Sequence, residues 1–478
     1  MAHLDKFKCI ETSIVIDVLD KINSNEKGVV FVVDSTNKIL GVMTDGDIRR
    51  ALLNNVKLND SIQDIYNKKF TYATTAESTS EKIKKLDHRV KILPVVDENF
   101  IVVDYFHKEN LFQIPISAPN LRGNEFKYLV DAFLSTWISS SGSYIEIFEN
   151  NFAAFCEAKH GVAVSNGTVA IHLALKALGI GKGDEVIVPD LTFAATINTV
   201  FHAEATPVIV DVENDSWCID PKEIEKAITP KTKAIIPVHL YGQACDMDAI
   251  MAIAKKHNLY VIEDCAEAHG ARFNGKRVGS IGHIGCFSFF ANKVITTGEG
   301  GMCTTNDLRL MELMKVMRDH GMNKNKKYYH EVIGYNYRMT NLQAAIGVAQ
   351  LERIEEILQQ RSGLENEYRT LLAGSNIIEF QRNDLKNRDK ITWLVSVLVK
   401  GNYKDLVVEK LKEAGIDVRP FFISLGEMEI YKPYLFSNSN SLRLSKVGLN
   451  FPTSGETSSK VTKTIQEVVR KIEEQIVV

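Results

Sequence analysis

Cysteine is scarce in this sequence, and no two cysteines stand close together. The 478 residues include seven cysteines, which are scattered singly and lack the CxxC spacing of metal and redox motifs. An odd number of isolated cysteines argues against a disulfide framework and favours reduced thiols. The cysteine pattern therefore predicts a cytoplasmic protein, and we expect no metal site.

Long apolar runs and charge of one sign are also missing. The N-terminal stretch MAHLDKFKCIETS has no apolar run like that of a signal peptide, and no later run approaches the roughly 18 apolar residues of a membrane span. The 57 Lys and Arg residues nearly balance the 60 Asp and Glu residues. Because these charges nearly cancel, the sequence shows no excess of one charge that would indicate binding to nucleic acid or to an anionic membrane. Anions are therefore expected to bind only at local sites.

The first 113 residues contain two copies of one pattern. One copy, VFVVDSTNKILGVMTDGDIRRALL, begins at Val30, and the other, ILPVVDENFIVVDYFHKENLF, begins at Ile92. In each copy a short β-rich run reaches an Asp turn, a second apolar run follows, and a helix-like segment closes the unit. We predict a tandem repeat over residues 1–113, which the turn-rich segment IPISAPNLRGNE (residues 114–125) links to a second domain.

Beyond about Gly161, apolar strands alternate with amphipathic helices. Runs such as DEVIVP and NLYVIED are almost continuously apolar, which indicates strands buried on both faces. The pattern predicts an α/β large domain over residues 114–355, with a mostly parallel sheet between layers of helices. The later segments TWLVSVLVKG and VVEKLKEAG predict a smaller α/β lobe over residues 356–478. Functional side chains are then expected at the carboxyl ends of the large domain's strands.

The stretch VAVSNGTVAIHLAL is a candidate phosphate site. A predicted strand ends in Ser165-Asn166-Gly167-Thr168, and a predicted helix begins there. Free N–H groups and the positive end of the helix dipole bind phosphate, and Gly167 lets the backbone come close to it. From this stretch alone, a plain helix cap explains the same four residues more often than a phosphate site does, and both interpretations stay open.

Two titratable residues stand where the large domain should place its site. Asp264 ends the apolar strand LYVIED, where a buried carboxylate needs a partner such as a protonated ring nitrogen, unless it caps the next helix. Lys293 lies in FSFFANKVITTGEGGM, between an apolar run and a glycine-rich turn. Its apolar flanks are expected to lower its pKa and free an amine for a Schiff base, although a surface lysine is the ordinary alternative. Ser288 could offer a hydroxyl to the same phosphate.

Phe193 supplies a fourth feature. It follows the strand DEVIVP, where its ring could stack on a planar cofactor or simply belong to the core. A phosphate cradle, a carboxylate for a ring nitrogen, a reactive amine and a stacking ring are what pyridoxal phosphate (PLP) requires of a protein. The conjunction of the four features predicts a PLP enzyme.

Several motifs resemble the DegT/DnrJ/EryC1/StrS family of sugar-nucleotide aminotransferases. They are SNGTVAIHLAL, GDEVIVPDLTFAATIN, VHLYGQACDM, VIEDCAEAHG, FSFFANKVITTGEGGM and GYNYRMTNLQAAIGVAQLE, in order from about residue 114 to the C-terminus. The resemblance implies a fold-type I PLP enzyme in which Lys293 forms the Schiff base and later carries the proton. It also implies that Asp264 holds the pyridinium nitrogen and that Gly167, Thr168 and Ser288 hold the phosphate.

The same resemblance assigns four further positions. Phe193 would cover one face of the cofactor ring, Ala266 would lie under the other, and Glu267 would sit near the ring hydroxyl. Asn336, in GYNYRMTN, would reach the phosphate of the neighbouring subunit's cofactor. The expected assembly is therefore a homodimer.

The resemblance also implies a reaction, which is transfer of the amino group of L-glutamate to C4 of a nucleotide-linked 4-keto-6-deoxy sugar for surface polysaccharide. The stretch WISSSG (residues 137–142) is similar to family members that act on GDP-4-keto-6-deoxymannose. A UDP- or dTDP-linked sugar is the alternative, because many members carry Pro or His residues in the loop after Arg-Pro-x-Phe, whereas this chain reads RPFFISLGEMEIY from Arg419. The alternative from another class is a catalytically silent nucleotide-binding regulator.

The segment GVMTDGDIRRAL (residues 41–52) resembles the end of a CBS motif, and the tandem repeat over residues 1–113 resembles a CBS pair, a module that often binds nucleotides. By this resemblance Thr44 and Asp47 could hold phosphate and ribose. In the second copy Phe106 replaces the threonine and Glu109 replaces the aspartate, so at most one good nucleotide site is expected. A module that only assembles subunits, and so could build assemblies larger than the dimer, is an equally open interpretation.

Overall fold

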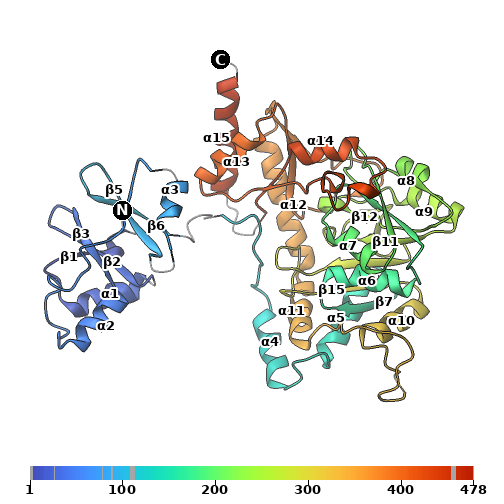
Figure 1. Ribbon diagram of the computed structural model, residues 1–478, viewed down its shortest axis with the longest axis horizontal. Helices are drawn as coiled ribbons and strands as arrows, with labels where there is room; N and C mark the ends of the chain where they lie inside the picture. The colour runs from blue at the N-terminus through green and yellow to red at the C-terminus, as the bar shows by residue number, and fades with distance from the viewer. Residues whose placement is uncertain are drawn as a thin grey trace. The chain divides into compact units, whose positions relative to one another are not determined.

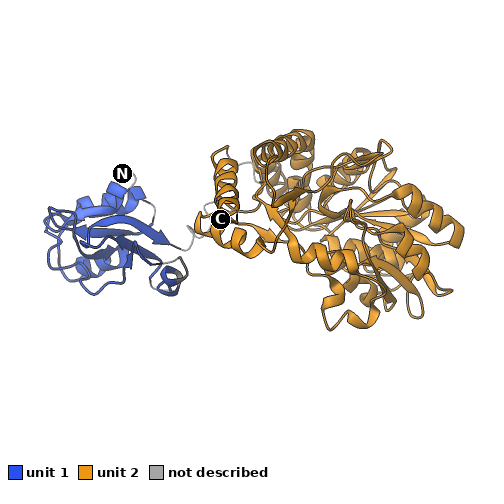
Figure 2. Cartoon of the chain, turned by 90° about the horizontal axis from the view of Figure 1, so that it is seen from above, with its two compact units in different colours: residues 1–113 blue, residues 114–478 orange. Residues whose placement is uncertain are grey.

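The chain folds into two compact units, residues 1–113 and 114–478, which are described separately (Figures 1 and 2). The computed structural model describes residues 4–25, 27–77, 79–87, 90–107, 114–323, 325–453 and 459–476. Among these residues, no helix is both long and apolar enough to cross a membrane. Glu109, the expected replacement in the second repeat, lies outside the described residues.

The first unit begins with a three-stranded sheet in the order β1-β2-β3. After the short η1 (Leu4–Phe7), α1 (Val15–Asn25) connects β1 (Lys8–Ile10) to β2 (Val29–Val33). The two strands pair in parallel. A hairpin then leads to the antiparallel β3 (Ile39–Thr44) and on to α2 (Asp45–Leu53).

The second half of this unit repeats the same topology. Its strands β4 (Ala73–Thr74) and β5 (Ile92–Val96) are parallel and are joined through α3 (Thr79–Lys84). The antiparallel β6 (Val102–His107) completes the sheet β4-β5-β6, and Phe106 lies in this strand. The two halves share one strand order and one pattern of pairing, as internal repeats do.

A seven-stranded sheet in the order β7-β15-β14-β11-β10-β8-β9 forms the large part of the second unit. Its strands are β7 (His160–Val164), β8 (Glu185–Pro189), β9 (Thr206–Val210), β10 (Thr232–Ile235), β11 (Tyr260–Asp264), β14 (Ile284–Ser288) and β15 (Gly301–Thr305). All neighbouring strands are parallel except β15, which runs antiparallel to both β14 and β7. The prediction of a mostly parallel sheet is therefore confirmed.

Helices cover both faces of this sheet (Figure 1). They are α5 (Ser143–Phe155), α6 (Gly167–Ala177), α7 (Ala195–His202), α8 (Pro221–Ala227), α9 (Met247–His257), α10 (Leu308–Arg318) and α11 (Asn341–Glu352), with α4 (Glu125–Leu134) packed on α11. Successive residues of β8 enter different cores: Ile187 packs with α5 and α9, whereas Val186 and Val188 pack with α6 and α7. A strand buried on both faces accounts for the continuous apolar run DEVIVP.

The C-terminal part forms a smaller lobe around an antiparallel sheet, β16-β18-β20-β19. Its elements are β16 (Ile378–Phe380), β18 (Val395–Val399), β19 (Arg419–Pro420), β20 (Gly448–Phe451), α12 (Ile354–Leu371), α13 (Lys404–Glu413), α14 (Ser439–Val447) and α15 (Ser459–Ile476). Shorter elements are η3 (Leu240–Gly242), η4 (Leu425–Glu427), η5 (Lys432–Tyr434) and the sheet of β12 (Arg272–Phe273), β13 (Lys276–Arg277) and β17 (Arg388–Asp389). This lobe has a separate core that includes Tyr368, Val407 and Ile465.

Candidate active site

Lys293 is enclosed rather than exposed. Its side chain is 12% exposed, and its Nζ lies 3.8 Å from Glu267 Oε1 and 3.9 Å from the centre of the Trp393 ring. Burial lowers the pKa of Lys293, while the negative charges of Glu267 and Asp264 oppose that shift. The lysine is thus a desolvated amine, because apolar surroundings disfavour its charged form.

Asp264 is the last residue of β11 and is 5% exposed. Thr196 Oγ1 donates a hydrogen bond of 2.8 Å to its Oδ2, and the Ala266 N–H donates one of 3.1 Å to its Oδ1. Burial raises the pKa of Asp264, and the two hydrogen bonds and the charge of Lys293 oppose the rise. No helix begins in the turns that follow Asp264, so this aspartate is not a helix cap.

Glu267 follows Asp264 in the same turn and is buried. The Tyr241 N–H donates a hydrogen bond of 2.9 Å to Glu267 Oε2. Burial raises the pKa of Glu267 to about 7, although the charge of Lys293 and the hydrogen bond from Tyr241 act in the opposite direction. Asp264, Glu267 and Lys293 therefore form one buried cluster of titratable groups.

The start of α6 lies against the end of β14. A Cβ atom on Gly167 would lie 2.7 Å from Ser288 Cβ, so the close approach needs a residue without a side chain. Asn166 caps the helix, since its Oδ1 accepts a 3.0 Å hydrogen bond from the Val169 N–H. The N–H groups of Gly167 and Thr168, in the first turn, have no partner within the helix. The capped helix therefore keeps free N–H groups in its first turn, and these residues fit a phosphorylated cofactor.

Phe193 and Ala266 stand on the loops that follow β8 and β11. The Phe193 side chain is 61% exposed, so it is not part of the core, and its ring centre lies 5.8 Å from that of Phe422. Ala266 is half-buried. An exposed ring beside the ends of the strands can stack on a planar ligand.

The structure does not bring Asn336 to this cluster within one subunit. Its side chain is exposed, and its Oδ1 accepts a hydrogen bond of 3.0 Å from Arg338 Nε. Among the described residues, no hydrogen bond joins Asn336 to Lys293, Asp264 or Glu267.

In the first unit, Thr44 and Asp47 contact each other. Thr44 Oγ1 donates a hydrogen bond of 2.7 Å to Asp47 Oδ2, and the Asp47 N–H donates one of 3.2 Å to Thr44 Oγ1. The Thr44 N–H also donates to Asp47 Oδ2, which completes a capping box at the start of α2. Arg50 forms an ion pair with the remaining Asp47 oxygen.

Three residues that contact the cluster were not predicted from the sequence, namely Trp393, Thr196 and Tyr241. Trp393 Nε1 donates a hydrogen bond of 2.8 Å to the Asn292 carbonyl, which fixes its ring over Lys293. The buried Arg361 was also missed, and it donates to the carbonyls of Trp393, at 2.6 Å, and Lys293, at 3.4 Å. The only feature of the sequence that could have indicated a role for Trp393 is a single tryptophan at the start of the segment TWLVSVLVKG. Nothing in the sequence around Thr196, Tyr241 or Arg361 indicates a contact with the cluster.

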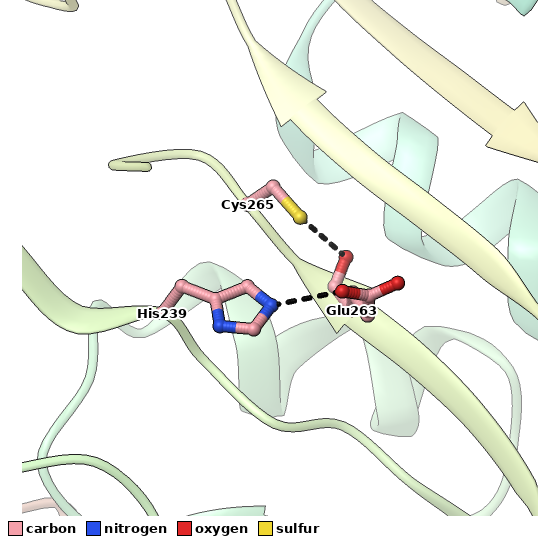
Figure 3. A group of neighbouring side chains, drawn as sticks. All are labelled: His239, Glu263 and Cys265. Carbon is pink, nitrogen blue, oxygen red and sulfur yellow. Dashed lines mark hydrogen bonds and ion pairs between the residues drawn. The ribbon is translucent and has the colours of Figure 1, made fainter. Parts of the chain in front are cut away.

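A second buried cluster, His239, Glu263 and Cys265, has metal-ligand residue types but a structural role (Figure 3). His239 Nδ1 accepts a hydrogen bond of 3.1 Å from the Cys245 N–H, so its Nε2 carries the proton and donates to Glu263 Oε2, also at 3.1 Å. Glu263 further accepts the N–H groups of Gly279, Ile281 and Gly282. Neither imidazole nitrogen has a lone pair left for a metal.

Known protein families match most of the second unit and part of the first. Residues 119–473 match the sequence profile of the DegT/DnrJ/EryC1/StrS aminotransferase family, and residues 9–54 match that of the CBS domain. GDP-perosamine synthase of Caulobacter vibrioides is 46% identical and that of Escherichia coli O157:H7 is 42% identical; the alignments cover 74% and 75% of this chain and 97% and 98% of those proteins. The solved structure of DesV from S. venezuelae superposes with a TM-score of 0.70 at 33% identity, over 73% of this chain and 94% of that one.

Proposed function

Because the chain belongs to the DegT/DnrJ/EryC1/StrS aminotransferase family, we propose that it transfers the amino group of L-glutamate to C4 of GDP-4-keto-6-deoxymannose, giving GDP-perosamine for surface polysaccharide. The chain is a PLP-dependent sugar aminotransferase. Two relatives named GDP-perosamine synthase, aligned over nearly their whole lengths, support the substrate.

The observation that carries the reaction type is the position of Lys293. Burial lowers the pKa of Lys293, whose side chain is 12% exposed, although the charges of Glu267 and Asp264 oppose that shift, so this amine gives up its proton more readily than an exposed lysine does. Lys293 would hold the cofactor, and, once released, would move the proton between the carbon atoms of donor and cofactor.

The other expected residues would hold PLP around this amine. Asp264 would pair with the ring nitrogen, and Gly167, Thr168 and Ser288 would bind the phosphate at the start of α6. When bound, PLP supplies an electron sink that stabilises negative charge at the donor's reacting carbon. The Thr196 hydroxyl, which donates to Asp264, would keep that carboxylate facing the ring nitrogen.

The remaining expected residues would shape the space around the ring. Phe193 would stack on one face, Ala266 would lie under the other, and Glu267 would sit near the ring hydroxyl. Phe193 has the exposure that such a role needs, and Ala266 is small enough for a flat ring to lie against it.

We infer that two copies of the chain form the working enzyme. Four large apolar side chains of α4 and the segment after it are 61–77% exposed, namely Phe126, Phe133, Leu134 and Trp137. Such a patch is typical of a surface that a partner covers. Asn336, which stays away from the cluster of its own subunit, would complete the phosphate site of the second copy.

Mass spectrometry of the products tests the proposed substrate. We expect the purified protein, given glutamate with an isotopically labelled amino nitrogen, to form a labelled amino sugar from GDP-4-keto-6-deoxymannose and not from a UDP-linked 4-keto-6-deoxy sugar. Product from the UDP sugar alone would overturn the GDP assignment and favour the UDP or dTDP alternative. No product from any keto sugar would favour the silent regulator.

We propose that the CBS domain of the first unit binds a nucleotide and thereby tunes the transferase. The match over residues 9–54 supports a site in the first repeat, although Thr44 and Asp47 already satisfy each other in the capping box. Calorimetric titration of the full chain with ATP and AMP is expected to give heat that is lost in Asp47→Asn. This variant keeps an oxygen that can accept from Thr44. Absence of heat in the unmodified chain would favour the assembly role.

A further inference from the structure

Glu267 is the carboxylate nearest to the Lys293 amine. In the described part of the chain it forms the only ion pair of Lys293, at 3.8 Å. Asp264, the other acid of the cluster, already accepts hydrogen bonds from Thr196 at 2.8 Å and Ala266 at 3.1 Å. Glu267 therefore has an oxygen that faces the amine and accepts no hydrogen bond from another described residue.

The backbone at Tyr241 holds Glu267 in this orientation. Tyr241 has φ 51° and ψ 30°, a left-handed conformation that costs free energy in a residue with a side chain. In this conformation its N–H donates to Glu267 Oε2 at 2.9 Å, which leaves Oε1 directed at Lys293. Strain of this kind persists where the surrounding structure fixes it, often at functional sites.

Trp393 limits the amine on another side. Its ring centre lies 3.9 Å from Lys293 Nζ, and the ring stacks on that of Tyr241, with centres 6.1 Å apart and planes at 21°. The face of an aromatic ring attracts a cation but accepts no proton from it. Among the described residues, the Glu267 carboxylate is thus the acceptor that lies nearest to the Lys293 amine.

We propose that Glu267 exchanges a proton with Lys293 during amino transfer. In one direction the N–H bond at Lys293 Nζ breaks as an O–H bond forms at Glu267 Oε1, which leaves a neutral amine beside a neutral acid. The reverse step restores the ion pair, so the net charge of the two residues is unchanged and no other reactant is needed. The proton exchange itself does not depend on the proposed function. Only the role of the exchange in turnover rests on that function.

The charges around the two residues favour this exchange. Burial raises the pKa of Glu267 to about 7 and lowers that of Lys293, which brings their proton affinities together. The other charged or titratable groups that face them are Asp264, Tyr241, His269 and Arg361, and burial raises the pKa of the Tyr241 hydroxyl so that it stays neutral. Burial lowers the pKa of His269 to about 3, so it stays neutral, and burial lowers that of Arg361 only to about 10, so it stays charged.

Infrared spectroscopy of the full chain without PLP, in which Lys293 carries a free amine, tests the exchange without any sugar. Below about pH 7, Glu267 is expected to give a carboxylic acid C=O band, which disappears as the pH rises through about 7. Glu267→Gln should lack the titrating band. The control Glu125→Gln should keep it, because the buried Glu125 accepts hydrogen bonds from Gly123 and Gln350 and not from Lys293. A titrating band that persists in Glu267→Gln would overturn the proposal.

The half-reaction with glutamate supplies the second measurement. Glu267→Gln is expected to slow it by about 10²-fold or more, the contribution typical of a positioned acid or base, and to remove the rise in rate near pH 7. The glutamine can still accept from the Tyr241 N–H, so PLP content and thermal stability should stay close to those of the unmodified protein. An unchanged rate and pH profile in this variant would overturn the proposal. Failure of the sugar assay would leave both measurements interpretable, because neither uses the sugar.

Discussion

Replacement of Lys293 by alanine is expected to abolish amino transfer, with turnover reduced by about 10⁴-fold or more. The substitution removes the only amine among the described residues that is placed within 4 Å of Glu267. It also removes the group that would hold the cofactor and carry the proton. The measurement is formation of labelled amino sugar over many turnovers, together with the visible absorption of the purified protein.

Lys293→Arg is the matched control. A guanidinium can still lie on Trp393 and pair with Glu267, so the fold should persist, but it stays protonated and can neither attack nor accept a proton. Both variants should therefore be inactive, and the arginine variant should keep the thermal stability of the unmodified protein. Sustained multiple turnovers by Lys293→Ala would refute the role of this residue.

Replacement of Glu263 by alanine is expected to lower the free energy of unfolding by about 3–5 kcal/mol. Glu263 is fully buried, and three backbone N–H groups and His239 Nε2 all donate to it. Truncation leaves these four donors buried without an acceptor. Urea unfolding followed by circular dichroism measures the change, for which we expect a lower midpoint at unchanged slope.

A surface carboxylate provides the control for Glu263. Glu225 pairs with Lys256 and His257 at 38% side-chain exposure, so Glu225→Ala should change the free energy of unfolding by less than about 1 kcal/mol. Burial alone would favour the neutral acid at Glu263, but the hydrogen bonds from His239, Gly279 and Gly282 hold its pKa below the usual value. Its contribution is therefore present above the unfolded pKa and is lost as the pH falls through the folded pKa. A Glu263→Ala variant as stable as Glu225→Ala would contradict this account.

The elements that local pattern determines could be predicted from the sequence. DEVIVP and LYVIED are apolar because both faces of β8 and β11 are covered, and that pattern is visible in a short window. Since strands of a parallel sheet end at one edge, the order of elements also indicated that residues near Asp264 and Ser288 would lie together. The antiparallel β15 was not predicted, because its pairing depends on the distant β7.

The residues that complete the cluster could not be predicted, because they arrive through tertiary packing. Trp393 follows Lys293 by a hundred positions, and its contact with the amine depends on how the C-terminal lobe packs on the large sheet. Tyr241 is not a glycine, so nothing in its residue type indicates positive φ. The contact between Thr44 and Asp47 could have been predicted from the sequence, because these two residue types three positions apart are also the signature of a capping box.

The contacts of Arg361 restrict how this enzyme can be recombined with its relatives. Arg361 lies in the C-terminal lobe and donates to the carbonyls of both Trp393 and Lys293. A chimera joined near residue 356 would take Lys293 from one parent. It would take Trp393, whose ring lies against the lysine amine, and Arg361, which contacts both residues, from the other parent. Such hybrids should be productive only when the incoming lobe carries both an arginine at position 361 and a tryptophan at position 393, because the carbonyl of residue 293 is a backbone group that either parent supplies.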